Sequence, residues 1–202
     1  MRFIFILFVF FSALLQAQTT DWVKSFGGDE SDKGISIGCD SLGYIYISGY
    51  YNTAIDFDQI NLTNNNAGGT NKENFVAKLD SNGNVIWAVP GGNQSGWCCD
   101  DRALGMHVTP GGDVFITGTF WSSYKLGVNG APGTLSVTQN AWNTALNSHD
   151  NSLLGKIDKD GIPQWVIGFG ADEGGSGAPC PGGVYDEDDH SYDVKVDDDG
   201  FI

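Results

Sequence analysis

The sequence predicts an all-β protein built from repeated four-stranded antiparallel sheets, and three observations lead to this prediction. Glycine and aromatic residues are abundant, with 29 Gly and 12% Phe, Trp and Tyr, a composition that favours strands and tight turns. Short segments alternate with a period of two, which is typical of strands. Three sequence blocks recur along the chain, which indicates a repeated structural unit.

The first block begins with a tryptophan. It reads Trp-Val-Lys-Ser-Phe-Gly-Gly-Asp-Glu from Trp22 and Trp-Val-Ile-Gly-Phe-Gly-Ala-Asp-Glu from Trp165, and a shorter version starts at Trp87. Because these tryptophans recur with the repeat, we expect them to pack between neighbouring sheets.

The second block covers residues 32–49 and 101–118, and a third copy starting at 189 is cut short at 202. Its first part alternates, and Cys39 aligns there with Val108 and Val196, so we expect Cys39 to be a buried core residue. Its second part is apolar on both faces, as expected for a strand between stacked sheets.

The third block covers residues 75–83 and 153–161 and leads to Trp87 and Trp165. Four turns of the form Asp-x-x-Gly occur at 40–43, 80–83, 158–161 and 197–200. Aspartate at the first position caps such a turn, and glycine at the fourth takes the left-handed conformation without a Cβ clash.

Four-stranded sheets repeated at this spacing predict a β-propeller, built from four-stranded antiparallel blades and incomplete in this chain. We assign residues 18–31 to a closure strand and connector, 32–92 to the first blade, 93–170 to the second, and 171–202 to a connector and the truncated start of a third. Segments 50–74 and 119–150 are expected to be loops. The remainder of the propeller is expected from downstream sequence.

Residues 1–17 are predicted to be a secretory signal peptide. Arg2 precedes an apolar run at 3–15, and Ala17 offers a small residue at the cleavage point. The run is too short to span a bilayer comfortably, and no later stretch is long enough for a transmembrane helix. We therefore expect a secreted or cell-surface protein.

The charge balance limits the partners. The chain has 25 Asp and Glu against 10 Lys and Arg, a net charge of −15 at pH 7, which argues against nucleic acid and anionic membrane surfaces. Arg102 is the single arginine beyond the signal peptide, so several guanidinium groups are not available to grip a carboxylate or phosphate.

These blocks resemble the SBBP family, the seven-bladed β-propeller repeat of exported bacterial proteins. The resemblance is carried by the Trp-x-x-x-Phe-Gly start, the core at 32–49 and the stretch at 75–83, and it implies a propeller on a secreted or surface protein without established catalytic residues. Residues 77–87 also resemble the tryptophan-docking motif of quinoprotein (PQQ-type) propellers, in which the tryptophan packs between blades.

Acidic connectors are one candidate site. Converging carboxylates can bind Ca²⁺. The alternative is a solvated acidic rim that keeps the protein soluble. The candidate calcium ligands are Asp29, Asp32, Asp100, Asp101, Asp188 and Asp189.

Two further sets of residues lie in connectors and insertions. Cys98 or Cys99 can bridge to Cys180 and clip two blades together, or all three remain free thiols. The tryptophans that do not recur can stack on a sugar or anchor a protein partner, or pack between loop and blade. These are Trp97, Trp121 and Trp142.

No nucleophile motif, phosphate loop or zinc-ligand spacing is found in the sequence. The interpretation we favour is a non-catalytic scaffold that presents loops to a glycan or protein partner. The alternatives are a propeller-class enzyme, either a glycan hydrolase or lyase or a PQQ-type quinoprotein, and a passive spacer in an adhesin.

Overall fold

The computed structural model describes residues 21–64, 71–92, 100–120, 123–128, 133–138, 151–170, 190–197 and 200–202. Within these ranges the regular structure consists of antiparallel β-strands, so the all-β prediction is confirmed. None of the described residues forms a helix long and apolar enough to cross a membrane. The predicted signal peptide at 1–17 lies outside the described residues.

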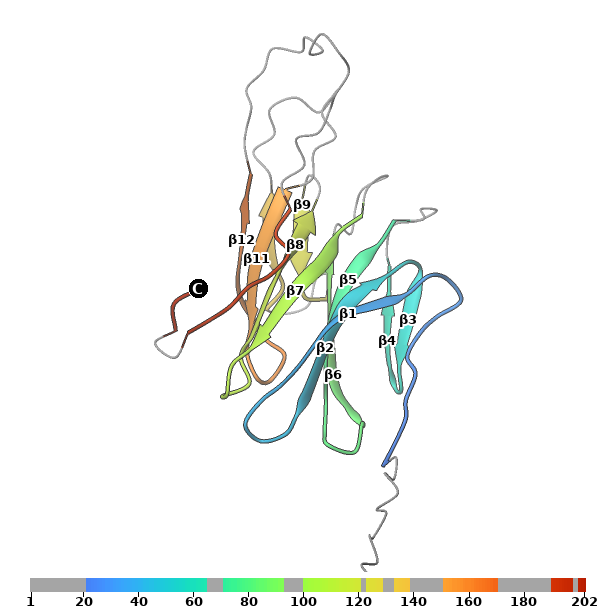
Figure 1. Ribbon diagram of the computed structural model, residues 1–202. Coiled ribbons are helices and arrows are strands. Elements are labelled where there is room, and N and C mark those ends of the chain that lie inside the picture. Colours follow the sequence, from blue (N-terminus) through green and yellow to red (C-terminus); the bar gives the residue numbers. More distant parts are fainter. Residues whose placement is uncertain are drawn as a thin grey trace, which may run out of the picture.

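Each of the two repeats forms a four-stranded antiparallel meander (Figure 1). The strands of the first repeat are β1 (Lys33–Cys39), β2 (Ile45–Tyr51), β5 (Glu73–Leu79) and β6 (Val85–Gly92). Those of the second are β7 (Arg102–Val108), β8 (Val114–Phe120), β11 (Asn151–Ile157) and β12 (Pro163–Phe169). Both meanders run in chain order from the first strand to the fourth. The four-stranded antiparallel meander predicted for each repeat is therefore present in both.

The segments predicted as loops contain an additional hairpin in each repeat, which corrects that prediction. The first repeat inserts β3 (Ala54–Phe57) and β4 (Ile60–Thr63), and the second inserts β9 (Ser123–Leu126) and β10 (Leu135–Thr138). Each hairpin buries alternate residues of its first strand: Ile55 and Phe57, then Tyr124 and Leu126. This short alternation is hidden in the sequence because Asn, Gly and Thr surround it.

The second hairpin joins the sheet of the first repeat. β9 pairs with the end of β6, so that the sheet has the order β1-β2-β5-β6-β9-β10. Gly91 lies opposite Leu126 and Gly92 opposite Lys125. The hairpin therefore extends the outer edge of one repeat with residues that belong to the next.

The predicted turns have the predicted chemistry. Asp80 Oδ1 accepts hydrogen bonds from the backbone N–H groups of Asn82 and Asn84 at 2.8 and 2.9 Å, and Asp158 does the same in the second repeat. Gly83 has a φ of +79°, in the left-handed region. In Figure 1 the turns between β1 and β2, β5 and β6, β7 and β8, and β11 and β12 gather at one edge of the sheets.

Residues 22–27, the predicted closure strand, contact the hairpin of the first repeat. The end of β6 contacts the hairpin of the second repeat in the same way. Gly27 forms a bridge with Asp56 on β3, as Gly92 does with Lys125 on β9. Phe26 packs on Phe57 with 5.1 Å between ring centroids. This segment therefore occupies the place of a fourth strand from a preceding sheet.

The core has two parts, one on each side of the first repeat. One lies between the repeats and includes Tyr46, Ile116, Tyr124 and Leu153. The other lies between the first repeat, its hairpin and Phe26. One face of the first sheet therefore packs against the second repeat, and the other packs against the β3–β4 hairpin and Phe26.

The prediction for Cys39 is wrong, because this residue is exposed. Ile37, on the same face of β1, is 76% exposed, whereas its equivalent Met106 on β7 is 8% exposed and Val194 in the third copy is 6% exposed. Met106 and Val108 are covered by β1, where a Cβ at Gly38 would approach them within 4 Å. In the described residues no preceding sheet covers the corresponding face of β1.

We expect this difference to govern two matched substitutions. Ile37→Lys should change the free energy of unfolding by no more than about 0.5 kcal/mol, as is usual for surface positions. Met106→Lys should cost about 3–5 kcal/mol or more, because it buries an unpaired ammonium group. Urea denaturation of the whole chain measures both values. Equal costs would mean that the face of β1 is covered after all.

Candidate functional site

Two of the recurrent tryptophans, Trp22 and Trp87, each contact a turn of the repeat that follows them in the chain. Trp22 Nε1 donates to the carbonyl of Ser81 at 2.9 Å, and Trp87 Nε1 donates to the carbonyl of Lys159 at 3.2 Å. Each acceptor lies in an Asp-x-x-Gly turn of the following repeat. Both tryptophans therefore make the same contact. The prediction that the recurrent tryptophans pack between sheets is confirmed for Trp87, whereas Trp22 belongs to a segment that forms no strand and is 38% exposed.

Each tryptophan ring also lies against the glycine of that turn. A Cβ at Gly83 would meet the Trp22 ring at 3.0 Å, and one at Gly161 would meet the Trp87 ring at 2.9 Å. Trp87 in addition meets Tyr46 of its own repeat edge to face, at 6.0 Å between centroids. The ring is thus held between an aromatic side chain of its own sheet and a bare backbone surface of the next sheet.

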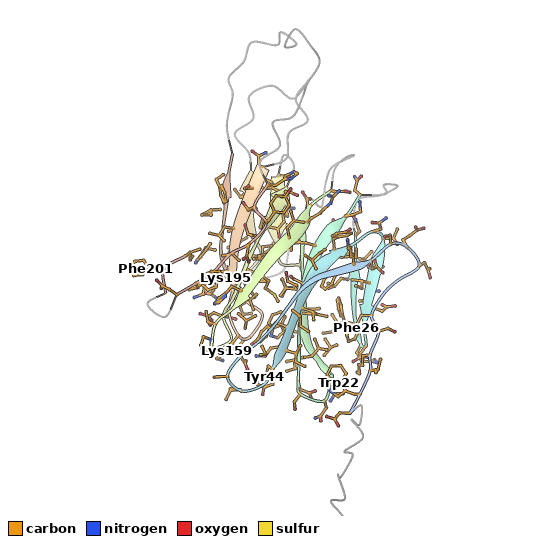
Figure 2. All side chains as sticks on the ribbon, viewed as in Figure 1. Trp22, Phe26, Tyr44, Lys159, Lys195 and Phe201 are labelled. Carbon is orange, nitrogen blue, oxygen red and sulfur yellow. The ribbon has the colours of Figure 1, made fainter. Side chains whose placement is uncertain are left out.

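Lys78 strengthens this contact with a charge. Its ammonium group donates to the same carbonyl of Lys159 at 3.0 Å and lies over the ring of Tyr44, 4.3 Å from the centroid. Tyr44 and Lys159 are labelled in Figure 2 at the junction of the repeats. Burial lowers the pKa of Lys78, against the attraction of Asp40 and Asp160. The ammonium group therefore bridges the two sheets, with the Tyr44 ring of the first repeat on one side and the Lys159 carbonyl of the second on the other.

We expect Gly161→Ala to destabilise the protein more than Gly43→Ala. Both glycines are left-handed, with φ of +85° and +83°, so each substitution should cost about 1–2 kcal/mol of backbone strain. A Cβ at Gly43 meets nothing within 4 Å, whereas one at Gly161 displaces Trp87 and should add about 1–3 kcal/mol. Urea unfolding gives the comparison, and indistinguishable values would show that the ring contact adds nothing.

A buried polar cluster lies at the opposite edge of the sheets. Glu73 is buried and accepts a hydrogen bond from the Tyr51 hydroxyl at 3.1 Å, while its second oxygen, Oε1, is buried with no hydrogen-bond partner. The neighbouring Asn74 donates through Nδ2 to the Tyr124 hydroxyl at 2.8 Å. Burial raises the pKa of Glu73 to about 7, although the hydrogen bond from Tyr51 acts in the other direction.

An ion-pair cluster lies beside it, centred on Asp100. The Asp100 carboxylate accepts from the backbone N–H of Lys72 at 3.0 Å, pairs with Lys72 Nζ at 2.6 Å, and also pairs with Arg102. Burial opposes ionisation, but the hydrogen bonds from Arg102 and Lys72 hold the pKa of Asp100 below its usual value. Because Lys72 precedes β5 and Arg102 begins β7, the carboxylate links the two repeats.

Glu73 should make stability fall as the pH rises. The folded state holds the Glu73 proton more tightly than the unfolded state, whose pKa is about 4.5, so its contribution is complete below that pH and is lost towards pH 7. The loss should be on the order of 3 kcal/mol. Glu73→Gln should flatten this slope and be more stable than the natural chain above pH 7. Urea unfolding across this range tests it, and parallel profiles for the two chains would contradict it.

The described carboxylates among the candidate calcium ligands are not brought together. Asp29 is exposed, Asp32 accepts from the backbone N–H of Gly28 at 2.6 Å, and Asp100 already pairs with two cations. Asp101 is buried, and its N–H donates to the carbonyl of Lys72. Over the described ranges, no three His, Cys, Asp or Glu side chains form a group that could hold a metal ion.

The remaining predicted site residues lie outside the described residues. They are Trp97, Trp121, Trp142, Cys98, Cys99, Cys180, Asp188 and Asp189. The sequence reasoning in turn missed the cluster of Glu73, Asn74 and Tyr124. The signal that could have found it is the polar pair Glu73-Asn74 directly before the apolar residues Phe75, Val76 and Ala77 of the third sequence block.

An apolar hollow of about 180 Å³ lies beside Trp87, lined by Val89, Val128, Ile162 and Pro163 among others. It is smaller than the pockets of ~300–1,000 Å³ that usually hold small ligands. The comparisons with known proteins match no family model and no curated protein. In the described residues, the contacts that recur from one repeat to the next are the tryptophan-to-turn hydrogen bonds and the hydrogen bonds within the Asp-x-x-Gly turns.

Proposed function

We propose that this chain is part of a β-propeller in which each repeat is one blade, and that the propeller is an exported, non-catalytic scaffold that binds a glycan or protein partner. The proposal follows the resemblance to the SBBP family. Its structural support is that each of the two repeats makes equivalent contacts with the segment that precedes it. In both cases a tryptophan of that segment lies on a turn of the repeat, and the end of the segment pairs with the hairpin of the repeat.

The main support for further blades is an exposed apolar face on each outer side of the pair of repeats. Ile37 is 76% exposed where its equivalents Met106 and Val194 are 8% and 6% exposed. At the other end, Ile167 on β12 is 50% exposed, whereas its equivalent Val89 on β6 is buried against the second repeat. Both outer faces therefore keep an apolar surface of the kind that is buried between the repeats, which supports the addition of further blades.

Residues 190–197 support the same interpretation. They run beside β7, where a Cβ at Gly105 would meet the carbonyl oxygen of Tyr192 at 2.7 Å, and Val194 is buried. β7 in turn lies beside β1, where a Cβ at Gly38 would meet the Val108 side chain at 2.8 Å. This position beside β7 supports our assignment of the segment to the first strand of a third blade.

The proposed binding side is the edge opposite the Asp-x-x-Gly turns. β2 and β8 end at this edge, and β5, β7 and β11 begin there (Figure 1). The connections that differ between the repeats therefore all leave the sheets on one side. Variable connections on a rigid scaffold are where binding residues are usually found.

Export and the absence of catalysis are proposed from the sequence. The segment at 1–17 has the pattern of a signal peptide, and a net charge of −15 suits a soluble scaffold. The residues that recur are tryptophans, glycines and turn aspartates, whose roles in the described residues are structural. The alternative of a quinoprotein-type enzyme is favoured by one observation, the tryptophan that docks on the next sheet.

A binding and turnover assay on the exported protein tests this proposal. The Ala variants of Trp97, Trp121 and Trp142 should include at least one that weakens binding to a glycan panel or cell surface about tenfold, as loss of a stacking anchor does. Val128→Ala, an exposed apolar change in the same insertion as Trp142, is the control and should leave binding unchanged.

No turnover of the panel and no uptake of PQQ are expected. Turnover that is lost when connector aspartates are changed would contradict the non-catalytic proposal. Visible absorbance from bound PQQ would favour the quinoprotein alternative instead. Unchanged binding in all three tryptophan variants would remove the proposed role of these side chains.

A further inference from the structure

The end of β12 exposes large apolar side chains. Phe169 is 48% exposed and Ile167 is 50% exposed, and Gly168 and Gly170 between and beyond them are also exposed. The equivalent end of β6 is buried, because β9 pairs with Gly91 and Gly92 there. The outer edge of β12 therefore lacks, in the described residues, the hairpin that covers its counterpart.

The hairpins meet the preceding strand in the same register. Asp56, the third residue of β3, pairs with Gly27, and Lys125, the third residue of β9, pairs with Gly92. The Gly127 N–H also donates to the carbonyl of Pro90 at 2.9 Å. A hairpin on β12 in this register places its third residue opposite Gly170 and its fourth opposite Phe169.

The side chains at the two contacts are matched in size. Where the strand carries Gly91, the hairpin carries Tyr124, and a Cβ at Gly91 would collide with the Tyr124 hydroxyl and the Asn74 amide. In the first repeat, the segment 22–27 carries Phe26 at the position equivalent to Gly91, and the hairpin carries Ile55 at the position equivalent to Tyr124. Phe26, labelled in Figure 2, and the smaller Ile55 lie in one apolar cluster. A large residue on the strand thus goes with a smaller one on the hairpin.

β12 belongs to the second of these two types. It carries Phe169, as residues 22–27 carry Phe26, and Phe169 lies opposite Ser152 on β11, where the first repeat has Asn74 opposite Gly91. Asn74 and Tyr124 fill the space above glycine, whereas serine leaves room for the phenylalanine ring. The site on β12 is therefore too small for a tyrosine at the second position of the hairpin.

We infer that the outer edge of β12 is a docking site for an antiparallel β-hairpin of the β3–β4 type, with an aliphatic residue in place of Tyr124, supplied by a following repeat. Pairing of the strand edges provides the affinity, and packing of Phe169 on the hairpin provides the specificity. This inference rests on the proposed function, because it names the segment of the next blade that the second blade receives.

The size rule can be tested first in the existing interface. Gly91→Phe should lower the urea midpoint strongly, because the ring meets Tyr124 and Asn74. The triple variant Gly91→Phe, Tyr124→Ile, Asn74→Ser combines the isoleucine that accompanies Phe26 with the serine that lies opposite Phe169, and it should recover most of that loss. A triple variant as unstable as the chain with Gly91→Phe and Asn74→Ser alone would overturn the rule.

The docking site itself is tested by extending the chain. Residues 46–92 are added after Ile202, because Phe201 and Ile202 stand where Tyr44 and Ile45 stand in the first repeat. The added segment supplies a complete β3–β4 hairpin. Amide hydrogen exchange at residues 167–170 should slow at least about tenfold relative to the unextended chain.

Ile55→Tyr in the added segment is the matched variant. It should abolish that protection, and Phe169→Gly in the same chain should restore it, as expected for coupled positions. If the extended chain shows protection and Ile55→Tyr in the added segment does not remove it, the size rule is overturned but the proposed function still stands. No protection at 167–170 in any extended chain would count against the stacking of a further blade, and hence against both.

Discussion

The rest of the fold depends on the placement of a tryptophan ring on the bare backbone of a glycine in the next sheet. Trp87 lies on Gly161 and Trp22 on Gly83, and in each case the indole N–H also donates to a carbonyl of the same turn. A flat ring and a turn without a Cβ allow two sheets to approach closely while the polar edge of the ring stays hydrogen-bonded. The turn can present that surface because an aspartate side chain holds it and glycine accepts the left-handed conformation. The contact of Trp87 thus holds the two sheets close together at the edge where the turns lie.

Polar groups complete the junction at its other edge. Asp100 joins Lys72 to Arg102, and Glu73 and Asn74 fill the space above Gly91 and Gly92 together with Tyr124. The two carboxylates respond to pH in opposite ways: the ion pairs favour ionised Asp100, while burial favours protonated Glu73. The junction is therefore most stable in mildly acidic solution, where Asp100 is charged and Glu73 still holds its proton.

Much of this fold can be predicted from the sequence, because the interactions that define it are local and repeated. The Asp-x-x-Gly turns, the alternating strands and the tryptophans at fixed places need no knowledge of distant contacts. The hairpins and Glu73 could not be found in this way, since their burial depends on a neighbouring sheet. Cys39 was misassigned for a related reason: its pattern is that of a core strand, but the surface that would cover it is not among the described residues. The loop tryptophans and the other cysteines lie outside the described residues and remain predictions.

The close contact of Gly91 with Tyr124 has a consequence for how such a chain can be duplicated. The meander of a repeat ends with its fourth strand, but the side chain that fits this strand is encoded further on, in the hairpin of the next repeat. A duplication that copies whole sheets separates these partners at the break point. One that copies from a fourth strand to the end of the next third strand, as from β6 to β11, adds four meander strands and a hairpin and keeps the partners together. A copy made in this frame carries a fourth strand that already fits the hairpin following it.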